Sequence, residues 1–273
     1  ERGGGDYVEE ARVAAIVGSR YHPEWIVTIK ETGQAWLVDY SRLDQPGRPL
    51  PVTMLDADLY LHDGGWAGER YFVVAANALD KVIVIDSLDR TVVAEVTAGN
   101  TPHPGRGANW VHPEFGPVWA TGNLGSGELT VVGADPEGHP EYAWEAVARV
   151  EVPHTGNLFI KTHPASPWLL YDFPMSPLAN AAASICAIDI IELETDRCWE
   201  VPGAADLNAR MVHIEFNRSG SEFWVSAWGT MDEPSFIAVY DSVTLEEIHR
   251  IDEDWVRTPT GKFNAHNTAH NVY

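Results

Sequence analysis

Residues 70–97 read RYFVVAANALDKVIVIDSLDRTVVAEVT and contain three short runs of β-branched and aromatic residues separated by turn residues. Runs of this kind, bounded by Asn, Asp and Ser, predict antiparallel strands joined by tight turns. The trio returns as EFWVSAW, SFIAVYDS and LEEIHRI over residues 222–251, and its Asp-Ser turn recurs at Asp86-Ser87 and Asp241-Ser242. We therefore expect a repeated structural unit.

Further copies of this unit lie between and before the two trios. Their matching strand positions are spaced by 47, 50 and 55 residues. Units of this length with four short strands are typical of β-propeller blades, so we predict an all-β propeller with about five blades. A β-sandwich or barrel is the alternative, although such folds seldom repeat a turn motif at a near-constant period. Helix-like periodicity is confined to YAWEAVARV (142–150), where we expect a turn or two of helix. The matching positions are Phe72, Trp119, Leu169 and Trp224, and the first copy begins with EWIVTIKE (24–31) and QAWLVDYS (34–41).

The composition is that of a folded, acidic chain. Its 273 residues, 45% of them hydrophobic, are enough to bury a large core, and we expect one domain over residues 1–273. The opening ERGGGDYVEEARVAAIVGS reads as a loop followed at once by a strand, which suggests a mature form or a fragment that is incomplete on its N-terminal side. The 40 acidic residues exceed the 18 basic ones, and the net charge of −22 argues against nucleic acid and anionic membranes as partners.

The cysteines, the hydropathy and the C-terminal histidines limit which haem, metal and membrane sites the sequence supports. Cys186 and Cys198 are the only cysteines, and their spacing makes neither a CxxCH haem attachment nor a four-cysteine zinc site; a disulfide between them stays open. No apolar run approaches the ~18–20 residues that span a bilayer, and we see no signal-peptide pattern. His266 and His270 in NAHNTAHN would suit a metal only on a helix, which the Asn-rich surroundings disfavour.

Four histidines recur in register with the blades. His62 and His213 lie 10 and 11 residues before the matching strand positions, and His103 and His154 lie 16 and 15 residues before them. The innermost strand of a propeller blade runs along the central channel, so we expect all four at or just ahead of an innermost strand. His62 and His103, 41 residues apart, predict two imidazoles that adjacent blades present to one ligand. Any one of them taken singly is more simply a hydrogen-bonded structural histidine.

The segment TPHPGRGANWVHP (101–113) surrounds His103 with residues that stiffen or bend the backbone. Arg106 suits a carboxylate or an oxyanion, and Gly105 would let the backbone approach a ligand closely. A surface salt bridge is the alternative for Arg106 in so acidic a chain. Asp63 could orient His62 or could form an Asp-Gly turn. We read His112 and His163, each followed by Pro, as structural.

With these residues placed, a family resemblance is evident. LHDGG, TPHPGRGANWVHPEFGPVWATG, GADPEGHPEYAW, LFIKTHP and the ending TPTGKFNAHNTAHNVY resemble the haem d1 domain of cytochrome cd1 nitrite reductases and their relatives in haem d1 biogenesis. The resemblance runs from about Arg12 to the last residue, and TPHPGRGAN is highly specific. It implies an eight-bladed β-propeller that holds haem d1 in its central channel, of which this chain would supply about the last five blades.

The resemblance also implies roles for single residues. His62 and His103 match the distal pair, which in the reductases hydrogen-bonds nitrite on the iron and helps to protonate it. Arg106 matches an arginine at the anionic periphery of haem d1, and we place Gly105 and His154 beside the cofactor. The proximal iron ligand is expected upstream of this chain, so no metal ligand is assigned here, and haem c is expected only with an upstream domain.

The partners follow from the same resemblance. The small molecule would be nitrite or dihydro-haem d1, and the electron donor a small c-type cytochrome or a cupredoxin. A periplasmic location is implied, with a homodimer or an assembly with the missing N-terminal blades.

Three departures from the reductases leave the activity open. Asn123-Leu124-Gly125 stands where they have His-Leu-Gly, His154 replaces part of a glycine-rich lead into LFIKTHP, and His213 replaces a glutamine. Histidine at position 213 resembles the biogenesis branch, in which a dehydrogenase introduces the acrylate double bond of haem d1, and His213 would be its candidate base. The two distal histidines favour reduction of nitrite to nitric oxide; His154 and His213 favour biogenesis. A non-catalytic propeller scaffold is the third interpretation.

Overall fold

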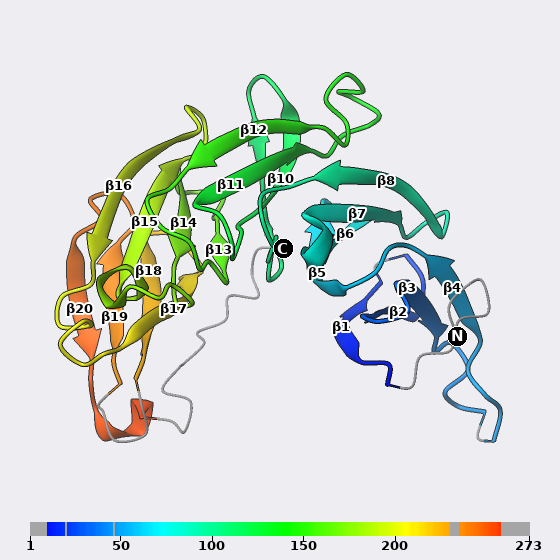
Figure 1. Cartoon of the computed structure of the whole chain (residues 1–273), viewed down its shortest axis with the longest axis horizontal. Helices are drawn as coiled ribbons and strands as arrows, with labels where there is room; N and C mark the ends of the chain where they lie inside the picture. Colours follow the sequence, from blue (N-terminus) through cyan, green and yellow to red (C-terminus); the bar gives the residue numbers. More distant parts are fainter. Residues whose placement is uncertain (1–9, 20, 46, 230–234, 258–273) are drawn as a thin grey trace.

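The computed structural model describes residues 10–19, 21–45, 47–229 and 235–257. Over these residues the chain forms five four-stranded sheets, and consecutive strands of each sheet pair antiparallel. The sheets follow one another around an arc, with the first strand of each on the inner side and the fourth on the outer side (Figure 1). The predicted β-propeller architecture with five blades is therefore confirmed.

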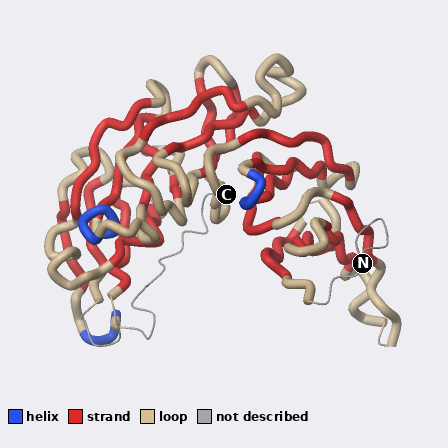
Figure 2. The backbone as a smooth tube through the Cα atoms, in the orientation of Figure 1, coloured by secondary structure: helices blue, strands red, loops and turns tan. Residues whose placement is uncertain are grey.

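Strands make up nearly all of the regular structure (Figure 2), and the helical elements are α1 (Ala179–Ala182), η1 (Asn77–Leu79) and η2 (Asp254–Val256). None of the helices in the described ranges is long and apolar enough to cross a membrane. The strands of blades 1 to 5, from inner to outer, are β1 (Val13–Gly18), β2 (Glu24–Ile29), β3 (Gln34–Asp39), β4 (Val52–Asp56); β5 (Leu61–Ala67), β6 (Tyr71–Ala76), β7 (Lys81–Asp86), β8 (Thr91–Thr97); β9 (Ala108–His112), β10 (Gly116–Thr121), β11 (Glu128–Gly133), β12 (Ala146–Glu151); β13 (Ile160–Lys161), β14 (Trp168–Asp172), β15 (Ser184–Asp189), β16 (Glu194–Glu200); and β17 (Arg210–Phe216), β18 (Glu222–Trp228), β19 (Ile237–Asp241), β20 (Glu247–Ile251).

The repeated Asp-Ser turn has a clear physical basis. Asp86, Asp189 and Asp241 end the third strands of blades 2, 4 and 5, and each uses Oδ1 to accept hydrogen bonds of 2.8–3.1 Å from the backbone N–H groups two and three residues on. The Ser87 hydroxyl donates to the carbonyl oxygen of Arg70 at 2.7 Å. Aspartate at this position satisfies backbone donors that the turn takes out of the sheet, which is why the motif marks the blade period.

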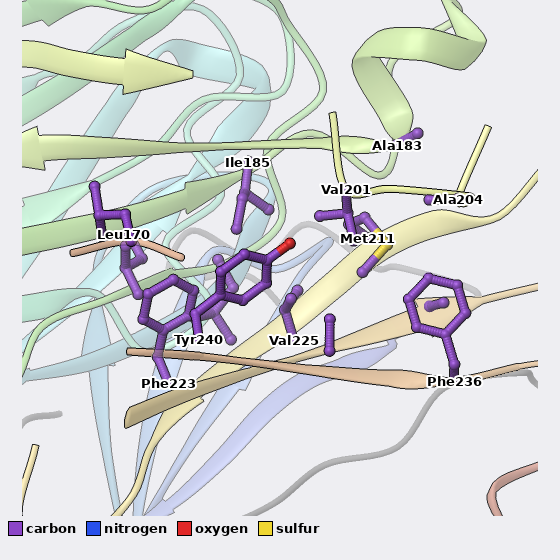
Figure 3. Packing of buried hydrophobic residues seen from close by; sticks show 14 of the residues in the cluster. Leu170, Ala183, Ile185, Val201, Ala204, Met211, Phe223, Val225, Phe236 and Tyr240 are labelled. Atoms are coloured by element: carbon purple, nitrogen blue, oxygen red, sulfur yellow. The ribbon is translucent and has the colours of Figure 1, made fainter. Parts of the chain in front are cut away.

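The core lies between the blades. Alternate residues of β6 face opposite ways, so Phe72 and Val74 pack with blade 1 while Val73 and Ala75 pack with blade 3. A sheet covered on both faces needs apolar residues throughout its middle strands, which explains the unbroken run in RYFVVAAN. Figure 3 shows the cluster between blades 4 and 5, in which the rings of Phe223 and Tyr240 stack at 4.9 Å.

The structure corrects one expectation and resolves another. The helix expected over 142–150 is wrong: Ala146–Glu151 forms β12, the outer strand of blade 3, which pairs with β11. Its apolar residues fit either period, and the hydrogen-bonding edge of β11 decides in favour of a strand. Cys186 and Cys198 form a disulfide that joins β15 to β16. The C-terminal motif with His266 and His270 lies outside the described residues.

Candidate functional site

His62 and Asp63 lie in a bulge of β5, the innermost strand of blade 2. The pairing with β6 shifts between Leu61 and Gly64, so the two intervening residues stand out of the ladder. Asp63 therefore lies in a strand rather than in the alternative Asp-Gly turn. A Cβ atom at Gly64 would lie 2.3 Å from the Val73 carbonyl oxygen, so the glycine permits a backbone approach that no side chain allows.

His103 lies in the loop that leads into β9, the innermost strand of blade 3. Its backbone N–H donates to the Gly122 carbonyl oxygen at 3.0 Å, and Gly107 N–H closes a turn onto Pro104 at 2.7 Å. Gly105 has a φ of 62°, in the left-handed region that favours glycine. The proline- and glycine-rich sequence thus fixes the backbone on both sides of the imidazole, which is 11% exposed.

Adjacent blades bring the two imidazoles together around one carboxylate. The rings of His62 and His103 are 5.0 Å apart. Asp63 Oδ1 lies 3.1 Å from His62 Nδ1, and Asp63 Oδ2 lies 3.5 Å from His103 Nδ1. We call these three residues the His-Asp-His cluster; their potential ligand atoms lie within 4.8 Å of one another, close enough for a metal ion.

The hydrogen bonds assign a tautomer to each imidazole. His103 Nδ1 lies 3.1 Å from the Leu158 carbonyl oxygen, which can only accept, so Nδ1 carries the proton. By the same argument His62 Nδ1–H donates to the Asp63 carboxylate. Neither Nε2 atom makes a hydrogen bond to any residue that the structure describes. Both Nε2 atoms are therefore available to a ligand.

Phe159 connects this cluster to blade 5. Its ring lies edge-on at 6.3 Å from the His103 ring and 4.4 Å from the His213 ring. His213 lies in a bulge of β17, with a φ of 57°, and its side chain is half-buried. A buried ion pair of 3.0 Å between Lys161 Nζ and Glu215 Oε1 joins the inner strands β13 and β17. Burial lowers the pKa of Lys161 to about 8.

Asp172, at the end of β14, accepts a hydrogen bond from the Phe159 backbone N–H and is fully buried. Burial raises the pKa of its carboxyl group to about 8, although hydrogen bonds from the backbone N–H groups of Phe159 and Leu158 act to lower it. Phe159 lies within the motif LFIKTHP, which supports the family resemblance but assigns Phe159 no role, and no motif marked Asp172. The one local signal is the position of Asp172 at the end of an apolar run, WLLYD, where a buried carboxyl group is unusual.

The structure places Arg106 next to the His-Asp-His cluster and His154 away from it. Arg106 is exposed, and its Nη1 donates to the Gly64 carbonyl oxygen at 3.3 Å, next to Asp63. It forms no ion pair with any described residue. The surface salt bridge considered as the alternative is therefore not formed within the described part of the chain, and the positive charge of Arg106 is available to a ligand. His154 precedes β13 as expected, but its ring packs edge-on against Phe173 at 5.4 Å and has no contact with the other three histidines among the described residues.

His112 and His163 have the structural role expected of them. His112 Nε2 donates to the Ile191 carbonyl oxygen at 2.9 Å, and its Nδ1 accepts from two backbone N–H groups of the following turn. His163 Nδ1 accepts from the Ala165 N–H at 3.1 Å. Both rings are buried and cap turns.

Comparison with known proteins identifies the family of this chain. Residues 2–268 match the family model of the cytochrome D1 heme domain. The chain belongs to this family. It is 41% identical over 282 residues to a nitrite reductase of Stutzerimonas stutzeri, covering 98% of the chain and 50% of the relative. The chain thus spans about half the length of the curated relative that it matches.

Two solved structures share the fold. The dihydro-heme d1 dehydrogenase NirN, in complex with DHE, superposes with a TM-score of 0.71 and 24% identity, covering 89% of this chain and 47% of NirN. Kuenenia stuttgartiensis hydrazine synthase superposes with a TM-score of 0.64 and 12% identity, covering 88% of this chain and 67% of that one. At these identities the similarity bears on the propeller fold alone.

Proposed function

We propose that this member of the cytochrome D1 heme domain family binds haem d1 along its inner strands and forms the nitrite-reducing site of an oxidoreductase. The observation that carries the proposal is the His-Asp-His cluster, in which two imidazoles from adjacent blades share one carboxylate. Membership of the family and the identity to a nitrite reductase support it.

The residues present suit an anionic tetrapyrrole. The Arg106 guanidinium is exposed and has a cationic fork for carboxylates, and the Phe159 ring offers an apolar edge between His103 and His213. When bound, haem d1 would supply the iron that holds nitrite and the electron that reduces it. This chain would supply the remaining groups.

The two histidines would deliver the protons. Reduction of nitrite to nitric oxide and water consumes one electron and two protons. Because Nδ1–H of each imidazole donates to Asp63 or to the Leu158 carbonyl oxygen, each ring would take up a second proton at Nε2 and pass that proton on to nitrite. The His62 side chain is 32% exposed and that of His103 only 11%, so His62 would be replenished from solvent more readily. A small c-type cytochrome or a cupredoxin would supply electrons from outside.

The test uses the full-length holoprotein with reduced donor. His103→Ala should lower nitrite turnover by about 100-fold, the usual contribution of a positioned general acid, while haem uptake persists in the absorption spectrum. His249→Ala is the matched control, since His249 is an exposed residue of the outer strand β20 and should leave turnover unchanged. Unchanged turnover in the His103 variant would contradict the proposal.

A second candidate is oxidation of the propionate side chain of dihydro-haem d1 to an acrylate. His213 favours it, because its ring lies 4.4 Å from the Phe159 ring, which also contacts the His103 ring, and it could accept one of the two protons that leave together with two electrons. Incubation with dihydro-haem d1 and an electron acceptor would separate the two activities. Absence of acrylate formation would remove this candidate, and absence of stoichiometric tetrapyrrole uptake would point to a scaffold.

A further inference from the structure

The Asp172 carboxyl group holds a backbone segment that leads into the candidate site. Its Oδ1 accepts three hydrogen bonds, from Leu158 N–H at 3.0 Å, Phe159 N–H at 2.9 Å and Asn157 Nδ2 at 3.0 Å. Two successive N–H groups on one oxygen define the direction of the backbone through residues 157–159. Asn157 Nδ2 adds hydrogen bonds to the carbonyl oxygens of Phe159 and Asp172, at 2.9 and 3.0 Å.

Both groups that segment 157–159 presents to the site depend on this arrangement. The Leu158 carbonyl oxygen accepts the hydrogen bond from His103 Nδ1–H, and the Phe159 ring lies between His103 and His213. A rotation of the segment would remove the acceptor from His103 and displace the ring together. Gly105 packs closely against the Phe159 ring, since a Cβ atom at Gly105 would lie 2.7 Å from that ring.

A purely structural role is the simpler explanation for a buried aspartate. Asp86 is such a residue: it is 3% exposed, accepts two backbone N–H groups and pairs with Arg70, far along the chain from segment 157–159. Asp172 differs because no described residue gives it a cationic partner and because the groups that it holds contact His103. Its Oδ2 atom is buried and accepts no hydrogen bond of normal geometry from the described residues.

We propose that Asp172 is a positioning residue that fixes His103 in the Nδ1–H tautomer through segment 157–159, leaving His103 Nε2 for proton exchange. The significance for catalysis rests on the function proposed above, whereas the effect on the tautomer does not. Asparagine should replace Asp172, since its Oδ1 can accept the same three hydrogen bonds and its amide nitrogen would take the place of the unbonded Oδ2. Alanine should not.

The experiment is ¹⁵N NMR of the full-length protein labelled at histidine, without added haem, with the His103 signal assigned by its loss in His103→Gln. Ring nitrogen shifts distinguish the two tautomers. We expect the Nδ1–H tautomer in the native protein and in Asp172→Asn, and a mixture with at least a tenth of the Nε2–H tautomer in Asp172→Ala. Asp86→Ala, which removes a buried capping aspartate elsewhere, should leave the His103 spectrum unchanged.

Two outcomes would overturn the proposal: an unaltered His103 tautomer in Asp172→Ala, or the same change in Asp86→Ala. Should Asp172→Ala fail to fold, Asn157→Ala removes one of the three donors and should shift the tautomer in the same direction but less. Holoprotein turnover then separates the two hypotheses. A tautomer change with a tenfold loss of kcat supports both, and a tautomer change with native kcat keeps the positioning role but contradicts nitrite reduction through His103.

Discussion

Asp172→Asn should make the protein more stable at neutral pH and weaken the pH dependence of its stability. Burial raises the pKa of Asp172 from 3.8 to about 8 in the folded protein, whereas the unfolded chain keeps the ordinary value. The folded state therefore binds more protons than the unfolded state between these two values. The contribution of Asp172 to stability is fully present below about pH 4 and is lost as the pH rises through about 8.

The magnitude follows from the width of that window. One proton corresponds to about 1.4 kcal/mol of unfolding free energy per pH unit, and the whole window to about 6 kcal/mol. Asparagine resembles the protonated carboxyl group and does not titrate. The difference in unfolding free energy, Asp172→Asn minus native, should thus grow by about 2–3 kcal/mol between about pH 5.5 and 7.5.

Urea denaturation at several pH values, followed by tryptophan fluorescence, measures this difference. Asp86→Asn is the matched control: burial acts to raise the pKa of Asp86, but hydrogen bonds from Arg70, Asp89 and Leu88 lower it overall. The stability that Asp86 contributes is present above its unfolded pKa and is lost only as the pH falls through its folded pKa. The difference in unfolding free energy between Asp86→Asn and the native protein should therefore stay constant over the same pH range. Parallel pH curves for the native protein and Asp172→Asn would refute the reasoning.

Two further predictions concern stability. Gly107→Ala should lower the unfolding free energy by about 2–4 kcal/mol in a urea titration, because φ is 71° and the new Cβ would lie 2.2 Å from Trp119 Nε1. Gly68→Ala, with φ of 65° and nothing within 4 Å of the new Cβ, should lower it by only about 1–2 kcal/mol, and equal losses would contradict the packing argument. Replacing Cys186 and Cys198 by alanine should lower the unfolding free energy by about 2–3 kcal/mol, as expected for a disulfide that closes a loop of 12 residues. Dithiothreitol should lower the Tm of the native protein but not that of this variant; a variant whose Tm still falls would show that dithiothreitol acts elsewhere.

The fold could be predicted from the sequence because its signals are local. Unbroken apolar runs such as RYFVVAAN mark strands covered on both faces, and Asp86-Ser87 and Asp241-Ser242 mark equivalent turns of different blades. The period of these signals predicts the number of blades without knowledge of any contact between them. The expectation failed at 142–150, where short apolar spacing fits helix and strand alike and the neighbouring edge of β11 decides.

The candidate site is only partly local. The register of His62 and His103 with the blades predicted that they would approach each other, since the inner strands of adjacent blades and the loops leading into them face the same channel. Three-dimensional packing alone decided that one carboxylate, Asp63, would serve both imidazoles, and that Asp172 would hold the segment that contacts His103. His103 contacts Asp63 and Leu158 across blade boundaries, whereas Asp172 holds a segment of its own blade. The geometry of these contacts depends on how neighbouring sheets stack and where their strands bulge, which no local pattern encodes.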